Sequence, residues 1–209
     1  MTMQTVHLAV YDTMADWEYG YAIAGINNEA FQQTPGRYRV RTVGATREPI
    51  TTVGGVRIVP DLTLDEISPQ DSAMLILPGA NTWDTKENGA FAEAARLFLE
   101  AGVPVAAICG ATFGLADAGL LDDRGHTSSD PSYLALSENY RGASHYQNAG
   151  AVTDGPLITA GPAHPVEFAR EIFAKLDVYA RDKLDAWYGY YSTGDPSYFF
   201  RLMPEAAVS

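Results

Sequence analysis

The residue best suited to chemistry is Cys109, the only cysteine in the chain. It follows the apolar run 103–108 and precedes the stretch 110–116, which is made of small and apolar residues. A short run rich in Val, Ala and Ile predicts a strand buried on both faces. Gly110, directly after the cysteine, suits a tight turn into a helix. This pattern is typical of a nucleophile elbow, which holds the reactive side chain above the sheet in a strained backbone conformation.

A helix beginning at Gly110 would direct its free N–H groups and the positive end of its dipole toward the Cys109 sulfur. This arrangement predicts a lowered thiol pKa and a nucleophilic thiolate. A lone cysteine is more often a small buried hydrophobic residue. The flanking pattern favours the functional interpretation here.

Composition limits the class of protein. The chain has 209 residues, of which 46% are hydrophobic and 19% charged, as expected of one folded domain. Its net charge of −12 argues against binding to nucleic acids or anionic membranes. Since there is no signal-peptide pattern, no long apolar run and no possible intrachain disulfide, we expect a cytoplasmic protein.

Short apolar runs alternate with helical patterns along the chain. We expect strands at 6–11, 38–43, 73–77, 103–108 and 157–160, and helices at 16–31, 90–101, 110–118, 132–137, 165–176 and 180–188. This alternation predicts a parallel sheet covered by helices on both faces. Glycine-containing turns near residues 54–55 and 154–156 predict two hairpins. We interpret 1–184 as the main domain and 185–209 as an aromatic tail packed on it or on a partner.

In open α/β sheets, sites form beyond the carboxyl ends of the strands. The segments 12–18, 78–81 and 161–164 follow predicted strands and would therefore meet Cys109. Backbone N–H groups of the 78–80 loop, together with that of Gly110, could form an oxyanion hole. Glu18 could donate a hydrogen bond or act as a general acid or base. Alternatively, it is only a carboxylate favoured at a helix N-terminus.

Four histidines were considered as a base for the cysteine. His7 falls within the first strand and is expected to be structural, His145 lies in a loop that cannot be placed, and His126 and His164 lie in loops that could reach the site. No spacing resembles a metal site, a Walker A motif or a dinucleotide fingerprint. We therefore expect neither a metal nor a cofactor.

Several of these motifs together resemble the DJ-1/PfpI family of the class I glutamine-amidotransferase-like superfamily. They are residues 106–110, residues 77–79, Glu18, and residues 154–160 with 167–169, and the resemblance extends from about residue 6 to 176. It implies a single-domain α/β fold, a flavodoxin-like three-layer sandwich with a mainly parallel sheet, and a homodimer. It also implies a hydrogen bond from Glu18 to the Cys109 sulfur, and an oxyanion hole formed by the N–H groups of Ala80 and Gly110.

One segment departs from the family pattern. Many members carry a histidine where this chain has Asp130, and His126 lies four residues earlier. Either His126 assists Cys109 from a shifted loop, or Asp130 acts alone, or His164 substitutes. The missing histidine argues against peptidase activity. Because His164 is followed by Glu167 and not by a glutamate two residues on, we do not expect glutamine hydrolysis.

The sequence thus predicts a hydrolase or lyase in which Cys109 attacks a small electrophile, an aldehyde, amide or isocyanide, with Glu18 moving the proton. Its expected partners are that small-molecule substrate and a second copy of the chain. The alternative is a non-enzymatic redox sensor or stress protein that uses oxidation of Cys109. A third possibility is a binding module that has kept the fold and lost the chemistry.

Overall fold

The central sheet is built outward from β1 (Gln4–Ala9), which is buried from its second residue onward. The computed structural model describes residues 3–203 and has one seven-stranded sheet in the order β5-β2-β1-β6-β7-β9-β8. The other strands are β2 (Tyr38–Gly44), β5 (Leu62–Thr63), β6 (Ser72–Leu77), β7 (Val105–Ile108), β8 (Ala151–Asp154) and β9 (Leu157–Ala160). All neighbours pair in parallel except β8 with β9. The carboxyl ends of the parallel strands therefore meet at one edge.

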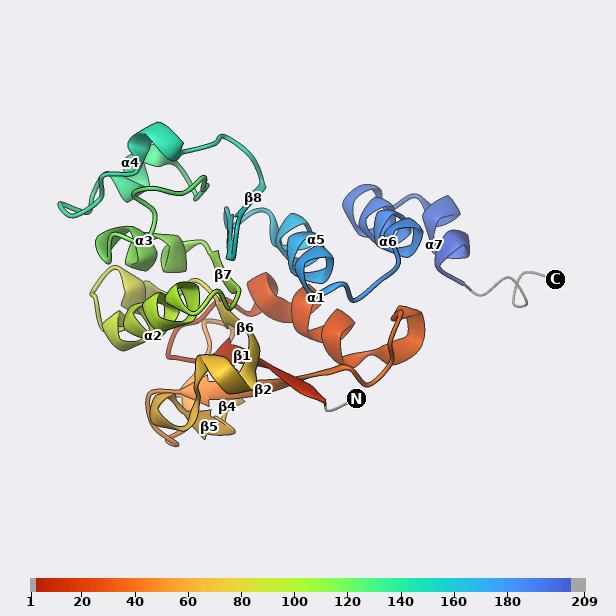
Figure 1. Cartoon of the computed structure of the whole chain (residues 1–209), viewed down its shortest axis with the longest axis horizontal. Helices are drawn as coiled ribbons and strands as arrows, with labels where there is room; N and C mark the ends of the chain where they lie inside the picture. Colours follow the sequence, from red (N-terminus) through yellow and green to blue (C-terminus); the bar gives the residue numbers. More distant parts are fainter. Residues whose placement is uncertain (1–2, 204–209) are drawn as a thin grey trace.

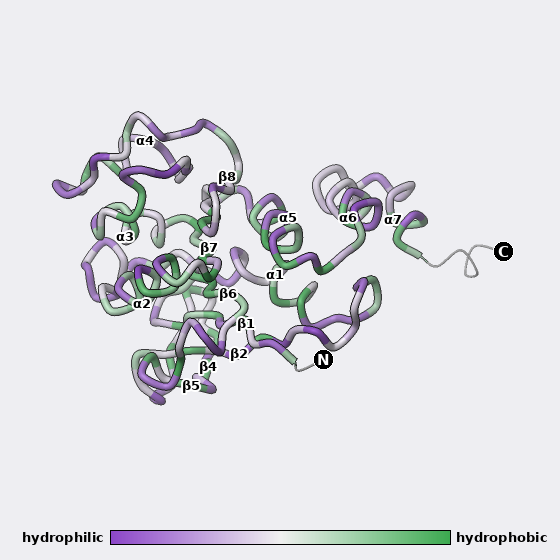
Figure 2. The backbone as a smooth tube through the Cα atoms, viewed as in Figure 1, coloured by the Kyte–Doolittle hydropathy of each residue, from purple (hydrophilic) through white to green (hydrophobic). Residues whose placement is uncertain are grey.

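Helices cover both faces of this sheet (Figure 1). On one face lie α1 (Asp16–Asn27) and α5 (Pro165–Leu176), and on the other lie α2 (Gly89–Glu100) and α3 (Gly110–Asp117). The predicted flavodoxin-like three-layer sandwich is thus confirmed. Hydrophobic residues concentrate in the strands and on the helix faces that contact them (Figure 2).

The helix expected at 16–31 is shorter than predicted. It ends at Asn27 and is followed by the 3₁₀ turn Glu29–Phe31. The Gln32 side-chain amide donates to the carbonyls of Gly25, Ile26 and Asn28 at 2.8–3.1 Å. It helps to satisfy the carbonyls at the helix end, of which that of Gly25 also accepts from the Tyr179 hydroxyl at 3.2 Å.

Both predicted hairpins are present. The first pairs β3 (Ile50–Thr51) with β4 (Arg57–Ile58), and the second pairs β8 with β9. The first is tied to the loop after β1, since Thr51 N–H donates to Asp12 (2.7 Å) and Gly54 N–H donates to Asp16 (2.8 Å).

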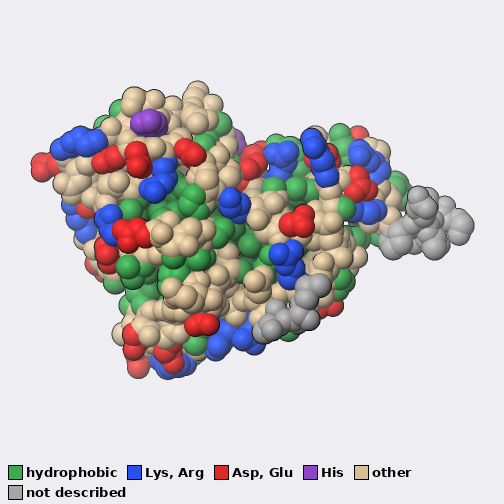
Figure 3. Space-filling model, viewed as in Figure 1, with side chains coloured by type: hydrophobic (Ala, Val, Ile, Leu, Met, Phe, Trp, Pro, Cys, Tyr) green, Lys and Arg blue, Asp and Glu red, His purple; other side chains and the backbone are tan. Residues whose placement is uncertain are grey.

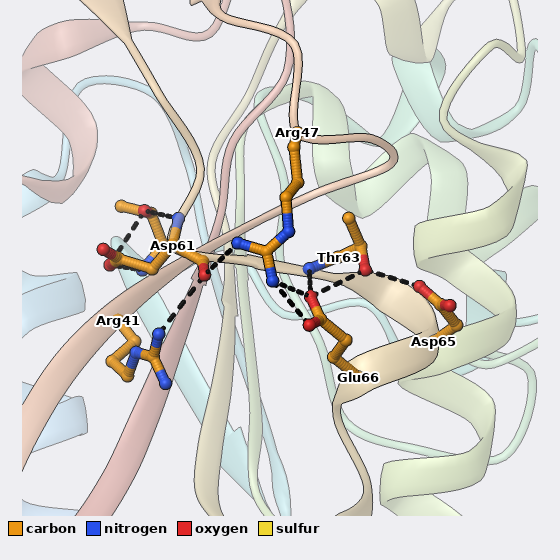
Figure 4. A network of polar contacts seen from close by, with 7 residues as sticks. Arg41, Arg47, Asp61, Thr63, Asp65 and Glu66 are labelled. Atoms are coloured by element: carbon orange, nitrogen blue, oxygen red, sulfur yellow. Dashed lines mark hydrogen bonds and ion pairs between the residues drawn. The ribbon is translucent and has the colours of Figure 1, made fainter.

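A polar network ties the chain before β3 to the chain around β5, at one edge of the sheet (Figure 4). The Arg47 guanidinium donates to the Asp61 carbonyl (3.0 Å) and to the Glu66 carboxylate (2.7 Å), and the Asp61 carboxylate accepts from Thr42 N–H of β2 (2.8 Å). These groups are exposed and contribute little to stability. They fix the loops on both sides of the small hairpin.

At the C-terminal end, α6 (Arg181–Thr193) and α7 (Pro196–Leu202) extend the layer formed by α1 and α5 (Figure 1). Trp187 is buried, with its ring centroid 4.9 Å from that of Phe173 and 6.1 Å from that of Tyr21. The expected boundary after residue 184 falls inside α6. Residues 1–2 of the predicted main domain and 204–209 of the predicted tail lie outside the described residues.

Charged side chains of both signs are distributed over the face shown in Figure 3. Within residues 3–203, no helix is long and apolar enough to cross a membrane.

Two glycines of α1 allow a matched test of its packing on α5. A Cβ at Gly25 would lie 2.3 Å from the Phe173 ring and 2.8 Å from the Tyr179 hydroxyl, whereas a Cβ at Gly20 would meet nothing within 4 Å. We expect Gly25→Ala to lower the free energy of unfolding by about 1–3 kcal/mol through overpacking. Gly20→Ala should raise it by up to about 1 kcal/mol through helix propensity. Urea denaturation of both variants measures this, and equal effects would contradict the packing described here.

Candidate active site around Cys109

The backbone of Cys109 is strained at the junction of β7 and α3, with φ 58° and ψ −126°. Such a conformation costs a non-glycine residue about 1–3 kcal/mol and needs support from its surroundings. Cys109 N–H donates to the Ala160 carbonyl of β9 at 3.0 Å. The Cys109 carbonyl accepts from Thr112 N–H (3.0 Å) and from the Thr112 hydroxyl (2.6 Å). The strained turn predicted from the sequence is therefore present and held from both sides.

Glu18 reaches the same point from the first turn of α1. Its side chain is 0% exposed, and Oε2 accepts from Gly79 N–H at 2.6 Å. In return, Ala15 N–H donates to the Gly79 carbonyl at 2.9 Å. The other carboxylate oxygen, Oε1, is buried without a hydrogen-bond partner among the described residues. A buried polar atom left in this way is costly, and at a reactive site it marks a place for a proton or a substrate.

The space that a side chain of Gly79 would occupy lies directly between the Glu18 carboxyl group and the Cys109 thiol. A Cβ at this position would be 2.6 Å from Cys109 Cβ, 2.9 Å from Glu18 Oε2 and 3.0 Å from Cys109 Sγ. A side chain here would therefore separate the two reactive groups. The preceding Pro78 carbonyl is held by the Tyr11 hydroxyl and by the Trp83 indole N–H (3.0 Å).

The two expected oxyanion-hole residues, Ala80 and Gly110, lie against each other beside the thiol. A Cβ at Gly110 would be 3.0 Å from the Ala80 carbonyl oxygen and 3.4 Å from the Ala80 nitrogen. Only a residue without a side chain allows this close approach. Both backbone segments therefore lie close together next to Cys109, and their role as an oxyanion hole stays a prediction.

The ionisation of the pair differs from the sequence prediction. Burial raises the pKa of Glu18 to about 7, although the Gly79 N–H and the Cys109 thiol oppose this. Burial and the neighbouring Glu18 charge raise the pKa of Cys109 to about 12, and the Gly110 N–H only partly opposes this. The predicted lowering of the thiol pKa was wrong, because desolvation and a nearby carboxylate outweigh the helix N-terminus. Between these two pKa values the pair holds one proton.

The structure does not support a role for His126. Its Nδ1 lies 2.7 Å from the Arg124 carbonyl and its Nε2 lies 2.7 Å from the Tyr140 hydroxyl. Both ring nitrogens are thus occupied within a buried structural contact. Burial also lowers the pKa of this histidine.

The other two candidates for assisting Cys109 also have different contacts. Asp130 is exposed and caps α4 (Pro131–Leu134) by accepting from Ser132 N–H at 2.8 Å. His164 precedes α5, with Nδ1 3.5 Å from the Glu167 carboxylate, and lines a separate cavity of about 340 Å³. Within residues 3–203, no hydrogen bond joins either one to Cys109 or Glu18.

Two residues near the site were missed by the sequence analysis. The Tyr133 hydroxyl donates to Asp84 Oδ1 at 2.6 Å, and the Tyr133 ring lies 5.3 Å from that of Phe113 in α3. The Asp84 charge contributes to the raised pKa of Cys109. Asp84 lies just beyond the 78–81 loop that follows β6, and its contact with Tyr133 spans 49 residues. No local sequence signal indicates such a contact.

A larger cavity, of about 540 Å³, lies outside this site. It is lined by Trp17, Gly20, Tyr21, Ala24, Gly25, Asn28, Phe31, Tyr179, Trp187 and Tyr191. The aromatic residues of the C-terminal segment thus pack toward α1 and leave a hollow there. Across the part of the chain that the structure describes, no three His, Cys, Asp or Glu side chains are grouped as metal ligands.

Fold and elbow together define a flavodoxin-like protein with a cysteine at the carboxyl edge of its sheet. The model of the DJ-1/PfpI family matches residues 4–175, and the chain belongs to this family. It is 44% identical to the Bacillus subtilis protein named "Uncharacterized protease YoaZ", over 97% of this chain and 98% of that protein. It is 32% identical to "Deglycase PH1704" of Pyrococcus horikoshii, over 62% of this chain and 77% of that protein.

Solved structures agree with this assignment. A thiJ/pfpI family protein from Bacillus anthracis superimposes with a TM-score of 0.89 at 44% identity, covering 97% of this chain and 98% of that one. The DJ-1 superfamily protein Atu0886 from Agrobacterium tumefaciens gives a TM-score of 0.83 at 26% identity, covering 92% and 100%.

The raised pKa of Glu18 makes stability depend on pH. Below its ordinary pKa of 4.5 the carboxyl is protonated in both the folded and the unfolded state. As the pH rises toward 7, the unfolded chain releases this proton while the folded protein keeps it, so stability falls. We expect the wild type to lose about 3 kcal/mol relative to Glu18→Gln between pH 5 and pH 8.

Urea denaturation of both proteins at the two pH values measures this difference. His7, whose pKa burial lowers to about 4, titrates in both proteins, so its contribution cancels. A difference that stays constant with pH would contradict the raised pKa of Glu18.

Proposed function

We propose that this protein is a cysteine-nucleophile enzyme, a hydrolase or lyase, that acts on a small electrophile such as an aldehyde, amide or isocyanide. The observation that carries the proposal is the placement of Glu18. A fully buried carboxylate with an unpartnered oxygen lies beside the only thiol of the chain, and the missing side chain of Gly79 leaves the space between them open. Burying a carboxylate oxygen without a hydrogen-bond partner costs free energy, which a purely structural side chain has no reason to incur.

The raised pKa values support Glu18 as the base. A thiol with a pKa of about 12 is not ionised before the reaction, so its proton must leave as the sulfur attacks. A carboxylate with a pKa of about 7 is a stronger base than an ordinary glutamate and is still about half ionised at neutral pH. The proton moves from Sγ to Glu18, and sulfur forms a bond to the electrophilic carbon. The π electrons of a carbonyl substrate then move to its oxygen.

The N–H groups of Ala80 and Gly110 would stabilise the negative charge on that oxygen. Removing one such donor costs on the order of 10²-fold in rate in other enzymes. Protonated Glu18 then returns its proton to the oxygen or to the leaving group. In the hydrolytic case, water releases the product from sulfur.

The names of the relatives agree with cysteine-dependent chemistry. One is named an uncharacterized protease and one a deglycase. The homodimer and the cytoplasmic location expected from the sequence stay predictions.

Replacing the nucleophile gives the most direct test. We expect Cys109→Ser to lose more than about 10³-fold of the turnover found in a panel of aldehydes, amides and isocyanides. Asp182→Asn, an exposed change on α6, is the control and should retain full activity. If wild type shows no turnover while peroxide adds two oxygens to Cys109, redox sensing replaces the enzyme proposal.

A second test uses the pH dependence of Cys109 labelling by iodoacetamide. Because the pair loses its first proton near pH 7, we expect the rate in wild type to rise with a midpoint near 7. In Glu18→Gln that step is absent, and the midpoint should lie above about 8.5, the value of a free thiol. Mass spectrometry follows the labelling, and an unchanged midpoint would exclude Glu18 as the base.

A further inference from the structure

The charges around Cys109 have one sign. The ionisable groups that raise the pKa of its thiol are Glu18 and Asp84, both acids. The nearest lysine in the chain after Asp84 is Lys86, and its ammonium is engaged by Asp117 at 3.0 Å. A site with this charge attracts cations and repels anions.

Asp84 is held in place from two sides. It ends the 3₁₀ turn Asn81–Trp83, whose Trp83 ring packs so closely on α3 that a Cβ at Gly114 would lie 2.1 Å from it. On the other side, the Tyr133 hydroxyl donates to Oδ1 at 2.6 Å. The aspartate therefore has a fixed position beside the first turn of α3, which begins directly after Cys109.

The second oxygen of Asp84 is available to a ligand. The side chain is exposed, and no hydrogen bond or ion pair to Oδ2 occurs within residues 3–203. At the same site, Glu18 Oε1 is buried and unpartnered. A substrate approaching Cys109 from solvent would meet Asp84 Oδ2 first, because Asp84 is exposed and Glu18 Oε1 is buried.

Building on the proposed function, we propose that Cys109 acts on substrates that carry an ammonium or guanidinium group near the electrophilic carbon, and that Asp84, positioned by Tyr133, binds this group. The bound cation would also offset the negative charge that disfavours the thiolate. Binding of the correct substrate would thereby make Cys109 easier to deprotonate, while an anionic substrate would have the opposite effect.

The single cysteine makes the test unambiguous. Two methanethiosulfonates are used, one with a trimethylammonium-ethyl group and one with a sulfonatoethyl group. In both, the Cys109 thiolate displaces methanesulfinate from the sulfenyl sulfur and forms a mixed disulfide with the alkylthio group, and the thiol proton passes to solvent. We expect the cationic reagent to modify the wild type faster. Asp84→Asn should lower the ratio of the cationic to the anionic rate about fivefold, because it removes one negative charge that acts at short range near the protein surface.

Two further variants sharpen the result. Tyr133→Phe keeps the Asp84 charge but not its hydrogen bond, so it should reduce the ratio less than Asp84→Asn does. Asp65→Asn makes the same charge change just after β5. In the sheet, β5 is four strand positions from β7, a separation of about 19 Å between the two strands. This control should leave the ratio unchanged. In wild type, the ratio should also fall toward one at 1 M salt.

Neutral iodoacetamide separates this inference from the proposed function. Asp84→Asn should increase labelling by this reagent, because it removes a charge that disfavours the thiolate. A purely structural role would not produce a faster neutral reaction together with a smaller cation preference. If iodoacetamide labels Cys109 as expected but the charge ratio is the same in wild type, Asp84→Asn and Asp65→Asn, the substrate inference fails and the enzyme proposal stands. If the folded wild type is not labelled at all, both fail.

Discussion

The close approach of three backbone segments at Gly79 is the constraint on which the site depends. This residue donates its N–H to Glu18, accepts from Ala15, and leaves no room for a side chain against Cys109. The segments come from the ends of β1, β6 and β7, which are neighbours in the sheet. Parallel pairing of buried strands therefore brings Glu18, Gly79 and Cys109 together, and the hydrogen bonds of Gly79 hold the first two in place.

Burial decides the chemistry of the pair more than the helix dipole does. Removing Glu18 and Cys109 from water raises both pKa values, and the Glu18 charge further disfavours the Cys109 thiolate. The result is a pair that keeps one proton over the neutral range and can move it during the reaction. In the proposed mechanism Glu18 takes the proton of Cys109, so no histidine is needed. The contacts of His126 with Tyr140 and the Arg124 carbonyl agree with this, as does the capping of α4 by Asp130.

The Glu18–Cys109 pair has buried, closely packed contacts on one side and exposed residues near it on the other. Tyr11 and Trp83 fix the Pro78 carbonyl from beneath, and the Trp83 ring fills the space at Gly114. Asp84 and Tyr133 extend this support to the surface, where the aspartate remains exposed. Within a family whose named relatives include both a protease and a deglycase, such groups at the rim are suited to selecting the substrate.

The sequence by itself determined five of the parallel strands, the elbow at Cys109 and both hairpins, because each depends on local apolar patterning or on turn residues. It did not predict the short edge strand β5, and it left Glu18 open between a role at the site and a carboxylate favoured at a helix N-terminus. It did not determine the ionisation of the thiol, because that depends on burial by segments distant in the chain. For the same reason it placed His126 among the candidates, although Tyr140 and the Arg124 carbonyl occupy both its nitrogens. The contact of Asp84 with Tyr133 was likewise decided only by the tertiary structure, since it joins the end of the 3₁₀ turn Asn81–Trp83 to α4, which no local pattern connects.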